Sequence, residues 1–236
     1  MKPGLVSAAA LAACLILSSP AQACGLALAL ALDVSGSVDP QEFALQRDGL
    51  AAALRDPSVS DALVAVKAAI LVVQWTGSTR QAVVIPWRRI GSRDALAALA
   101  VEVERMPRLW RHFSTGIGEA LIFTSGTFAE VGDCARKVID VSGDGRSNEG
   151  IAPQDVRRSL MRLGFTINGL AIEGSEPDLT GYYRDSVIAG PGAFVIAATG
   201  FRDYPEKIRR KLLTEVTEPV SHLPDAGALQ PAALQR

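Results

Sequence analysis

Histidine is scarce in this chain, whose 236 residues include only His112 and His222. A serine hydrolase needs a base beside its nucleophile, and catalytic zinc sites usually rely on histidine ligands, so both chemistries are disfavoured. No G-x-S-x-G turn surrounds a serine, and no G-x-x-x-x-G-K phosphate loop occurs. A metal-dependent hydrolase or a phosphotransfer enzyme is therefore the least favoured alternative.

An excess of charge of either sign is also missing. The chain has 24 Lys and Arg residues against 25 Asp and Glu residues, so its formal net charge is −1. A nucleic-acid-binding protein needs a basic surface, and this balance gives no indication of one. Apolar residues make up 48% and charged residues 21%, which is typical of a globular domain.

The one long apolar stretch lies at the N-terminus. Lys2 is followed by an almost wholly apolar run over 4–17, which is short for a membrane span, and Ala21-Gln22-Ala23 is an A-x-A cleavage site. We therefore interpret 1–23 as a signal peptide and expect an exported chain, periplasmic or secreted, without strong membrane affinity after cleavage. Lipoprotein processing at Cys24 and an uncleaved anchor are the alternatives.

Cysteine is nearly absent from the rest of the chain. Cys14 lies within the predicted signal peptide, which leaves Cys24 and Cys134. An even pair of cysteines in an exported protein predicts a disulfide. Two unrelated thiols are the alternative.

Apolar runs typical of strands alternate with helical patterns almost throughout. Strands are expected at 25–32, 64–75, 81–87, 136–142, 165–172 and 193–198. Helices are expected at 40–55, 92–106, 115–128, 153–163, 179–188 and 203–217. This alternation predicts an α/β domain with a doubly wound, mostly parallel sheet and helices on both faces.

Prolines and acidic residues set several of the expected boundaries. Asp39-Pro40-Gln41-Glu42 has the pattern of an N-cap with a capping box, and Asp56-Pro57 is expected to end that helix. The strands at 64–75 and 81–87 should form an antiparallel hairpin, and Pro86 places the second at a sheet edge. The domain should cover 24–218, and the small, proline-containing segment 219–236 is predicted to be disordered.

Polar side chains follow two of the expected strands. Asp33, Ser35 and Ser37 alternate after the first, and Asp140-Val141-Ser142-Gly143-Asp144-Gly145 closes the fourth; Ser114-Thr115-Gly116 opens a helix between them. If the first and fourth strands are neighbours, all three segments meet at one edge of the sheet. Carboxylate and hydroxyl oxygens without histidine or thiol suit a hard divalent cation, most naturally Mg²⁺.

These three segments resemble the von Willebrand factor A (vWA) domain. DVSGS matches the D-x-S-x-S of its metal-ion-dependent adhesion site (MIDAS), and Thr115 and Asp144 match its threonine and later aspartate. The resemblance implies that Ser35 and Ser37 bind the metal directly, Thr115 directly or through water, and Asp33 and Asp144 largely through water. The ion would be Mg²⁺, with Mn²⁺ or Ca²⁺ as alternatives.

The resemblance covers about 25–218, and the phrases VIDVSGDG, INGLAI and GPGAFV are similar to an exported bacterial subfamily of unknown function. It also implies that the first and fourth strands are adjacent and parallel. Cys24 and Cys134 would then meet at the end of the sheet opposite the metal, which supports the disulfide.

Simpler interpretations of the same residues remain open. Asp33, Ser35, Ser37 and Asp144 are also common turn and cap residues, and Ser114 or Thr115 could be a helix N-cap. The candidate partner-binding rim consists of four other residues, Arg146, Asn148, Glu149 and His112. A solvated loop explains that rim equally well.

The expected function is a non-enzymatic, metal-dependent protein-binding module whose metal is completed by an acidic side chain of a protein partner. The alternative is a structural or assembly module of the cell envelope, in which the metal only orders the loops. The sequence leaves the identity of that partner open.

Overall fold

The computed structural model describes residues 24–174 and 176–217. The predicted signal peptide and the predicted disordered tail lie outside the described residues. In the described part of the chain, six strands form one sheet in the order β3-β2-β1-β4-β5-β6. Their bounds are β1 Leu26–Asp33, β2 Ala69–Trp75, β3 Gln81–Arg89, β4 Arg136–Gly143, β5 Phe165–Ile172 and β6 Val195–Ala198.

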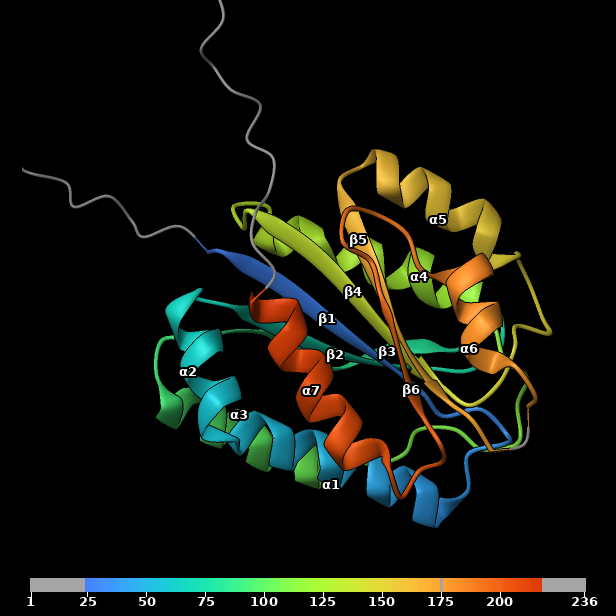
Figure 1. Cartoon of the computed structure of the whole chain (residues 1–236), viewed down its shortest axis with the longest axis horizontal. Helices are drawn as coiled ribbons and strands as arrows, with labels where there is room; N and C mark the ends of the chain where they lie inside the picture. Colours follow the sequence, from blue (N-terminus) through green and yellow to red (C-terminus); the bar gives the residue numbers. More distant parts are fainter. Residues whose placement is uncertain (1–23, 175, 218–236) are drawn as a thin grey trace, which may run out of the picture.

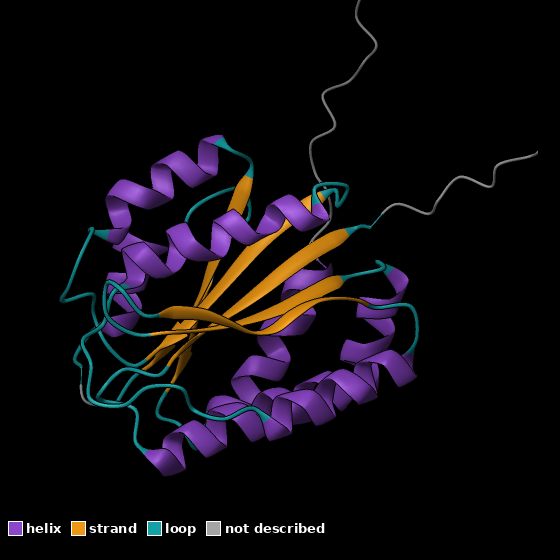
Figure 2. Ribbon diagram, turned by 180° about the vertical axis from the view of Figure 1, so that it is seen from behind, coloured by secondary structure: helices purple, strands orange, loops and turns teal. Residues whose placement is uncertain are grey.

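Helices cover both faces of this sheet (Figure 1, Figure 2). One face carries α1 Pro40–Arg55, α2 Pro57–Ala65, α3 Arg93–Arg105 and α7 Tyr204–Thr217. The other carries α4 Ile117–Gly126, the 3₁₀ turn η1 Thr127–Val131, α5 Pro153–Arg162, α6 Leu179–Tyr182 and the π turn η2 Tyr183–Val187. The predicted doubly wound α/β class is confirmed.

The central strand β1 shows how the sequence builds these layers. Its residues LALALALD are all buried. Side chains alternate across a strand, so the leucines pack into the core under α1 and α7, and the alanines face α4. A strand covered on both faces is consistent with its position between two parallel neighbours, β2 and β4.

The antiparallel hairpin is also confirmed. β3 pairs antiparallel with β2 and is the edge strand, and Pro86, which cannot donate to a sheet ladder, is exposed on it. At the start of α1, Asp39 accepts hydrogen bonds from the N–H groups of Gln41 and Glu42, and the Glu42 side chain accepts from Asp39 N–H. The predicted capping box is therefore present.

The region after α1 differs from the prediction. A strand was expected from residue 64, but α2 runs over Pro57–Ala65 and β2 begins at Ala69. The Asp56 carboxylate accepts hydrogen bonds from the N–H groups of Ser58 and Val59, so the Asp-Pro pair that ends α1 also begins α2. An N-cap aspartate followed by proline at the first helical position also begins a helix. The sequence prediction interpreted Asp56-Pro57 only as the end of α1.

A fully buried group of charges joins α7 to the middle of the sheet. Lys211 Nζ lies 2.8 Å from Asp140 Oδ1 on β4 and 2.5 Å from Glu215 Oε1. Asn168 on β5 donates to the same Glu215 oxygen at 3.0 Å. Burial, together with the charge of Glu215, raises the pKa of Asp140 to about 7, although Lys211 acts in the opposite direction. Asp140 therefore lies in the core and is separate from the polar cluster at the end of β4.

This buried carboxylate predicts a pH dependence of stability. The unfolded pKa of an aspartate is near 4, so on acidification the folded state takes up the Asp140 proton first and gains stability as pH falls from about 7 towards 4. Relative to Asp140→Asn, the wild type should lose unfolding free energy between pH 5 and 8, by at most about 1.4 kcal/mol per pH unit. Urea unfolding in EDTA, followed by circular dichroism, measures this difference. Parallel curves for the two proteins would contradict it; Asp94→Asn, at an exposed position on α3, is the control that should follow the wild type.

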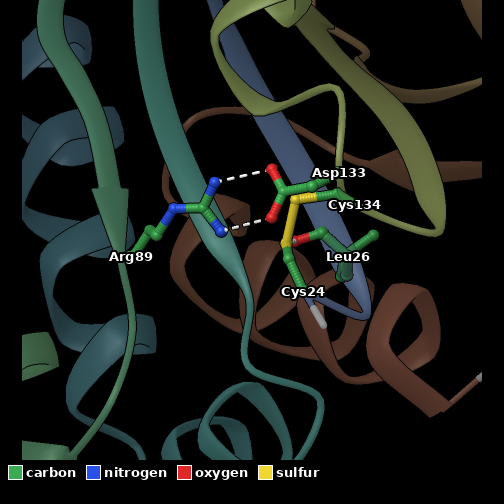
Figure 3. The surroundings of a disulfide bond; sticks show 5 residues. All are labelled: Cys24, Leu26, Arg89, Asp133 and Cys134. Atoms are coloured by element: carbon green, nitrogen blue, oxygen red, sulfur yellow. Dashed lines mark hydrogen bonds and ion pairs between the residues drawn. A yellow bond between two sulfur atoms is a disulfide. The ribbon is translucent and has the colours of Figure 1, made fainter. Parts of the chain in front are cut away.

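The predicted disulfide joins Cys24, just before β1, to Cys134, just before β4, across 110 positions (Figure 3). A backbone hydrogen bond joins the same two segments, because Ala135 N–H donates to Cys24 O at 2.9 Å. Beside it, the Arg89 guanidinium forms a two-point ion pair with Asp133, at 2.7 and 2.9 Å. The disulfide therefore fastens the starts of the two central strands, at the end of the sheet opposite Asp33.

No helix in the two described ranges has the length and apolar character needed to cross a bilayer.

Removing this link should destabilise the fold without changing it. The double variant Cys24→Ser, Cys134→Ser should lose about 2–5 kcal/mol of unfolding free energy, because a bond that closes so long a loop restricts the unfolded chain. Denaturant titration of the oxidised wild type and the variant measures the loss. An unchanged denaturation midpoint would show that the bond contributes nothing.

Candidate metal centre

The candidate site lies at the carboxyl ends of the central strands. β1 and β4 are parallel neighbours, and Leu32 is in register with Ser142, so Asp33 ends β1 beside the end of β4. The segment before α4 reaches the same edge, where Gly116 N–H donates to Thr76 O at 3.0 Å. The adjacency of the first and fourth strands is confirmed, and it brings the three polar segments together.

Asp33 is fully buried. Its Oδ1 accepts a hydrogen bond from Ser35 N–H at 2.7 Å, whereas Oδ2 has no partner among the described residues. Burial, and next the charge of Asp144, raises the pKa of Asp33 to about 7. A buried carboxylate with one free oxygen favours either a proton or a cation beside it.

Gly143 allows this packing. A Cβ atom at Gly143 would lie 2.8 Å from Asp33 Oδ2 and 2.8 Å from the hydroxyl of Tyr183, closer than real Cβ contacts occur. Tyr183 is also fully buried, and its hydroxyl has no partner in the described part of the chain. Because Gly143 has no Cβ atom, the Asp33 carboxylate has room to pack against the β4 backbone.

Ser35, Ser37 and Asp144 form a chain of polar contacts. Ser37 Oγ donates to Asp144 Oδ1 at 2.7 Å, and the two serine oxygens are 3.2 Å apart. Asp144 is 4% exposed, and burial is the main cause of the rise in its pKa. Side chains 107 positions apart in the sequence thus share one small polar cluster.

Thr115 is held beside this cluster by its own backbone. Its N–H donates to Asn148 Oδ1 at 2.9 Å, and its carbonyl accepts from the N–H groups of Asn148 and Glu149. Its hydroxyl oxygen would lie 3.6 Å from a Cβ atom on Gly145, so it faces the turn after Asp144. α4 begins at Ile117 with Gly116 as its N-cap and no side-chain cap, so the alternative that Thr115 is only a helix cap is wrong.

Asn148 and Glu149, two of the predicted rim residues, contact other parts of the chain. The Asn148 side chain binds Thr115, as described, and the Glu149 carboxylate accepts a hydrogen bond from the Ser78 hydroxyl. That bond is the main cause lowering the pKa of Glu149. Both residues therefore help to hold the edge together, and a contact with a partner stays a prediction.

Arg146 and His112 complete the predicted rim. Arg146 donates to Pro177 O at 3.1 Å, and its guanidinium lies 5.1 Å from the centre of the Tyr182 ring. His112 is exposed and has a left-handed backbone, with φ of 62°. These two residues lie on different loops of the same edge.

Arg108 is a component that the sequence analysis missed. Its guanidinium donates to the carbonyls of Val34 and Ser35, at 3.2 and 2.9 Å. Burial chiefly lowers the pKa of Arg108, and the charges of Asp33 and Asp144 act in the opposite direction. No local pattern marks an arginine that binds backbone carbonyls 73 and 74 positions away, so the sequence carried no signal for it.

The donors gathered here fit a hard cation. They are carboxylate and hydroxyl oxygens, which are the ligands that Mg²⁺ and Ca²⁺ prefer. Across the described residues, no three His, Cys, Asp or Glu side chains group in a way that could hold a metal ion. A cation at this edge would therefore depend on the serine and threonine hydroxyls, and the free Oδ2 of Asp33 supports its presence.

A family model described as "Protein of unknown function (DUF1194)" matches residues 23–220. The chain belongs to this family. No curated protein matches the chain. Membership of this family therefore assigns no activity to the chain, and solved structures give information on its fold.

Those structures share the vWA fold. Proximal thread matrix protein 1 from the mussel byssus is 17% identical with a TM-score of 0.61, over 82% of this chain and 48% of that one. A von Willebrand factor type A protein from Catenulispora acidiphila is 20% identical with a TM-score of 0.57, over 80% and 42%. BatB from Bacteroides thetaiotaomicron is 15% identical with a TM-score of 0.54, over 81% and 98%. The chain spans less than half the length of the first two proteins.

Metal binding provides the direct test of this site. Mg²⁺ or Mn²⁺ is titrated into the chelator-stripped chain, and the heat of binding is measured by calorimetry. About one ion should bind per chain, because the hydroxyl and carboxylate ligands form a single site. Ser35→Ala should abolish the heat of binding, because it removes one predicted direct ligand. Ser159→Ala, on an exposed helix surface, should bind as the wild type does. Equal binding by Ser35→Ala and the wild type would exclude the D-x-S-x-S loop as the site.

Proposed function

We propose that this chain is a non-enzymatic, divalent-metal-dependent protein-binding module of the cell envelope or exterior. One observation carries the proposal. Ser35, Ser37 and Asp144 converge in a single polar cluster next to Asp33, whose buried carboxylate has an unpartnered oxygen. This arrangement, at the carboxyl edge of a vWA fold, supports a MIDAS.

The residues have different roles in the proposed site. Ser35 and Ser37 would bind the cation directly, Thr115 directly or through water, and Asp33 and Asp144 largely through water. When bound, the ion supplies a coordination position for a carboxylate oxygen of a partner protein. Because the direct ligands are neutral hydroxyls, they leave the positive charge largely available to an outside acidic group.

The choice of metal follows from the donors. Oxygen ligands alone favour Mg²⁺, with Mn²⁺ or Ca²⁺ as alternatives. A further structure of the mussel byssus protein, 16% identical with a TM-score of 0.55, is described as having a zinc-occupied MIDAS motif. That description supports a divalent cation at the matching place in this chain.

Two further observations support the rest of the proposal. The Cys24–Cys134 disulfide suits an oxidising compartment, and so supports an exported chain. The Ser37 hydroxyl donates to Asp144, and the Ser35 hydroxyl lies 3.2 Å from that of Ser37. Partners of this kind suit cation ligands better than a nucleophile activated by a histidine base, which supports a non-enzymatic role.

A structural or assembly role is the second candidate. The hydrogen bond from Ser37 to Asp144, and the three bonds between Thr115 and the Asn148–Glu149 backbone and side chain, already tie the loops together. A metal added to such loops would mainly strengthen them, and a partner would then bind some other surface.

Capture experiments separate the two candidates. The immobilised chain is exposed to envelope proteins of its source organism in Mg²⁺, washed, and eluted with EDTA. A metal-dependent module should release its partner in EDTA and fail to retain it after Asp144→Ala, whereas Asp185→Ala, at an exposed position, should retain it. Circular dichroism confirms that each variant is folded. Retention that persists in EDTA would count against the proposal, and retention by folded Asp144→Ala would favour the structural role.

A further inference from the structure

The segment between α3 and α4 is fixed against the candidate metal loop. Gly36 N–H donates to Phe113 O at 2.8 Å, and a Cβ atom on Gly36 would lie 3.3 Å from the Cα atom of His112. Arg108 also donates to the carbonyl of Ser35. The left-handed backbone of His112 is unfavourable for a residue with a side chain, and these contacts hold it in place.

The other end of this segment is fixed by β2. Gln74 is fully buried; its Nε2 donates to Pro107 O at 2.8 Å, and its Oε1 accepts from Leu109 N–H at 3.0 Å. The segment is thus attached at both ends, to the ends of two central strands. A surface held in this way costs little conformational entropy when a partner binds to it.

The exposed side of the segment is apolar and positive. Leu109 and Phe113 are 42% and 37% exposed, and Arg111 is exposed as well. The Arg80 guanidinium stacks 3.7 Å from the centre of the Phe113 ring. Within the described residues, Arg111 has no hydrogen bond or ion pair, and Glu149, the carboxylate near Arg80, is bound to Ser78.

We infer that this surface binds acidic protein segments that contain an aromatic side chain. It consists of residues 108–113 and Arg80, and we call it the arginine rim, since it differs from the four-residue rim predicted from the sequence. Exposed arginine and aromatic side chains are enriched where binding energy concentrates in protein interfaces, and the positive charge complements an acidic segment. The inference rests on the proposed function, because the partner's carboxylate would reach the metal from the same segment. The arginine rim would then recognise the partner residues that lie next to this carboxylate in the partner's sequence.

Copolymers of glutamate and tyrosine can test this inference on the full chain, with its disulfide formed. Binding is measured by biolayer interferometry, in Mg²⁺ and in EDTA, against poly(Glu,Tyr), poly-Glu and poly-Lys. The chain should bind poly(Glu,Tyr) more tightly than poly-Glu and should not bind poly-Lys. Arg111→Glu and Phe113→Ala should each weaken binding of poly(Glu,Tyr) by about tenfold, the effect of losing one central contact.

A matched variant and the metal conditions separate the possible results. Arg162→Glu makes the same charge change at an exposed position at the end of α5 and should bind as the wild type does. Binding that is lost in EDTA but unchanged in Arg111→Glu and Phe113→Ala would support the metal-dependent function and overturn the inference that the arginine rim binds the partner. Binding weakened by both variants but unaffected by EDTA would support the arginine rim and contradict the metal-dependent function.

Two other results would overturn the inference directly. Equal binding of poly-Glu and poly(Glu,Tyr) would show that the arginine rim does not recognise aromatic side chains. Binding to vesicles with phosphatidylglycerol that depends on Arg111, without binding to poly(Glu,Tyr), would assign the arginine rim to an anionic membrane surface.

Discussion

The buried carboxylate of Asp33 is the constraint around which this edge of the molecule is arranged. It ends a strand covered on both faces, one of its oxygens has no partner among the described residues, and a second buried carboxylate, Asp144, lies close enough to raise its pKa. Burial of an unpaired charge is costly, so the folded edge favours a proton or a cation here. Gly143 gives the carboxylate its space, and Ser35 binds its other oxygen. The loops around it are joined by hydrogen bonds, from Ser37 Oγ to Asp144 Oδ1 and from Gly36 N–H to Phe113 O.

The position of β4 links this edge to the rest of the fold. The disulfide fixes the start of β4 against β1, and the ion pair between Asp140 and Lys211 fixes its middle against α7. Asp144, which directly follows the strand, then extends from a backbone held at two places. Because parallel strands fix register through an unbroken ladder, the distance between Asp33 and Asp144 is a property of the whole sheet rather than of the loops alone.

Patterns contained within a few residues were predictable from the sequence, and contacts across the fold were not. The continuous apolar run that forms β1 and the capping box at Asp39 are local, and both predicted the right structure. The Asp56-Pro57 pair is local too, but it fits both the end of one helix and the start of another, so α2 was missed. Arg108 binds carbonyls on a distant loop, and nothing near it in the sequence indicates this. The resemblance to vWA domains supplied the adjacency of β1 and β4 that composition and spacing left open.

The balance of charge at this edge links the proposed cation to the proposed acidic partner. Asp33 and Asp144 are both negative when ionised, and the partly buried Arg108 offsets one of the two charges. The remaining single negative charge would attract a divalent cation, and the bound cation would reverse the sign of the edge. Arg80 and Arg111, which lie outside the cluster, would then add to a positive surface instead of balancing a negative one. With the proposed metal bound, this edge would repel an acidic segment less and attract it more. Metal binding and acidic recognition would then be one coupled property of the site.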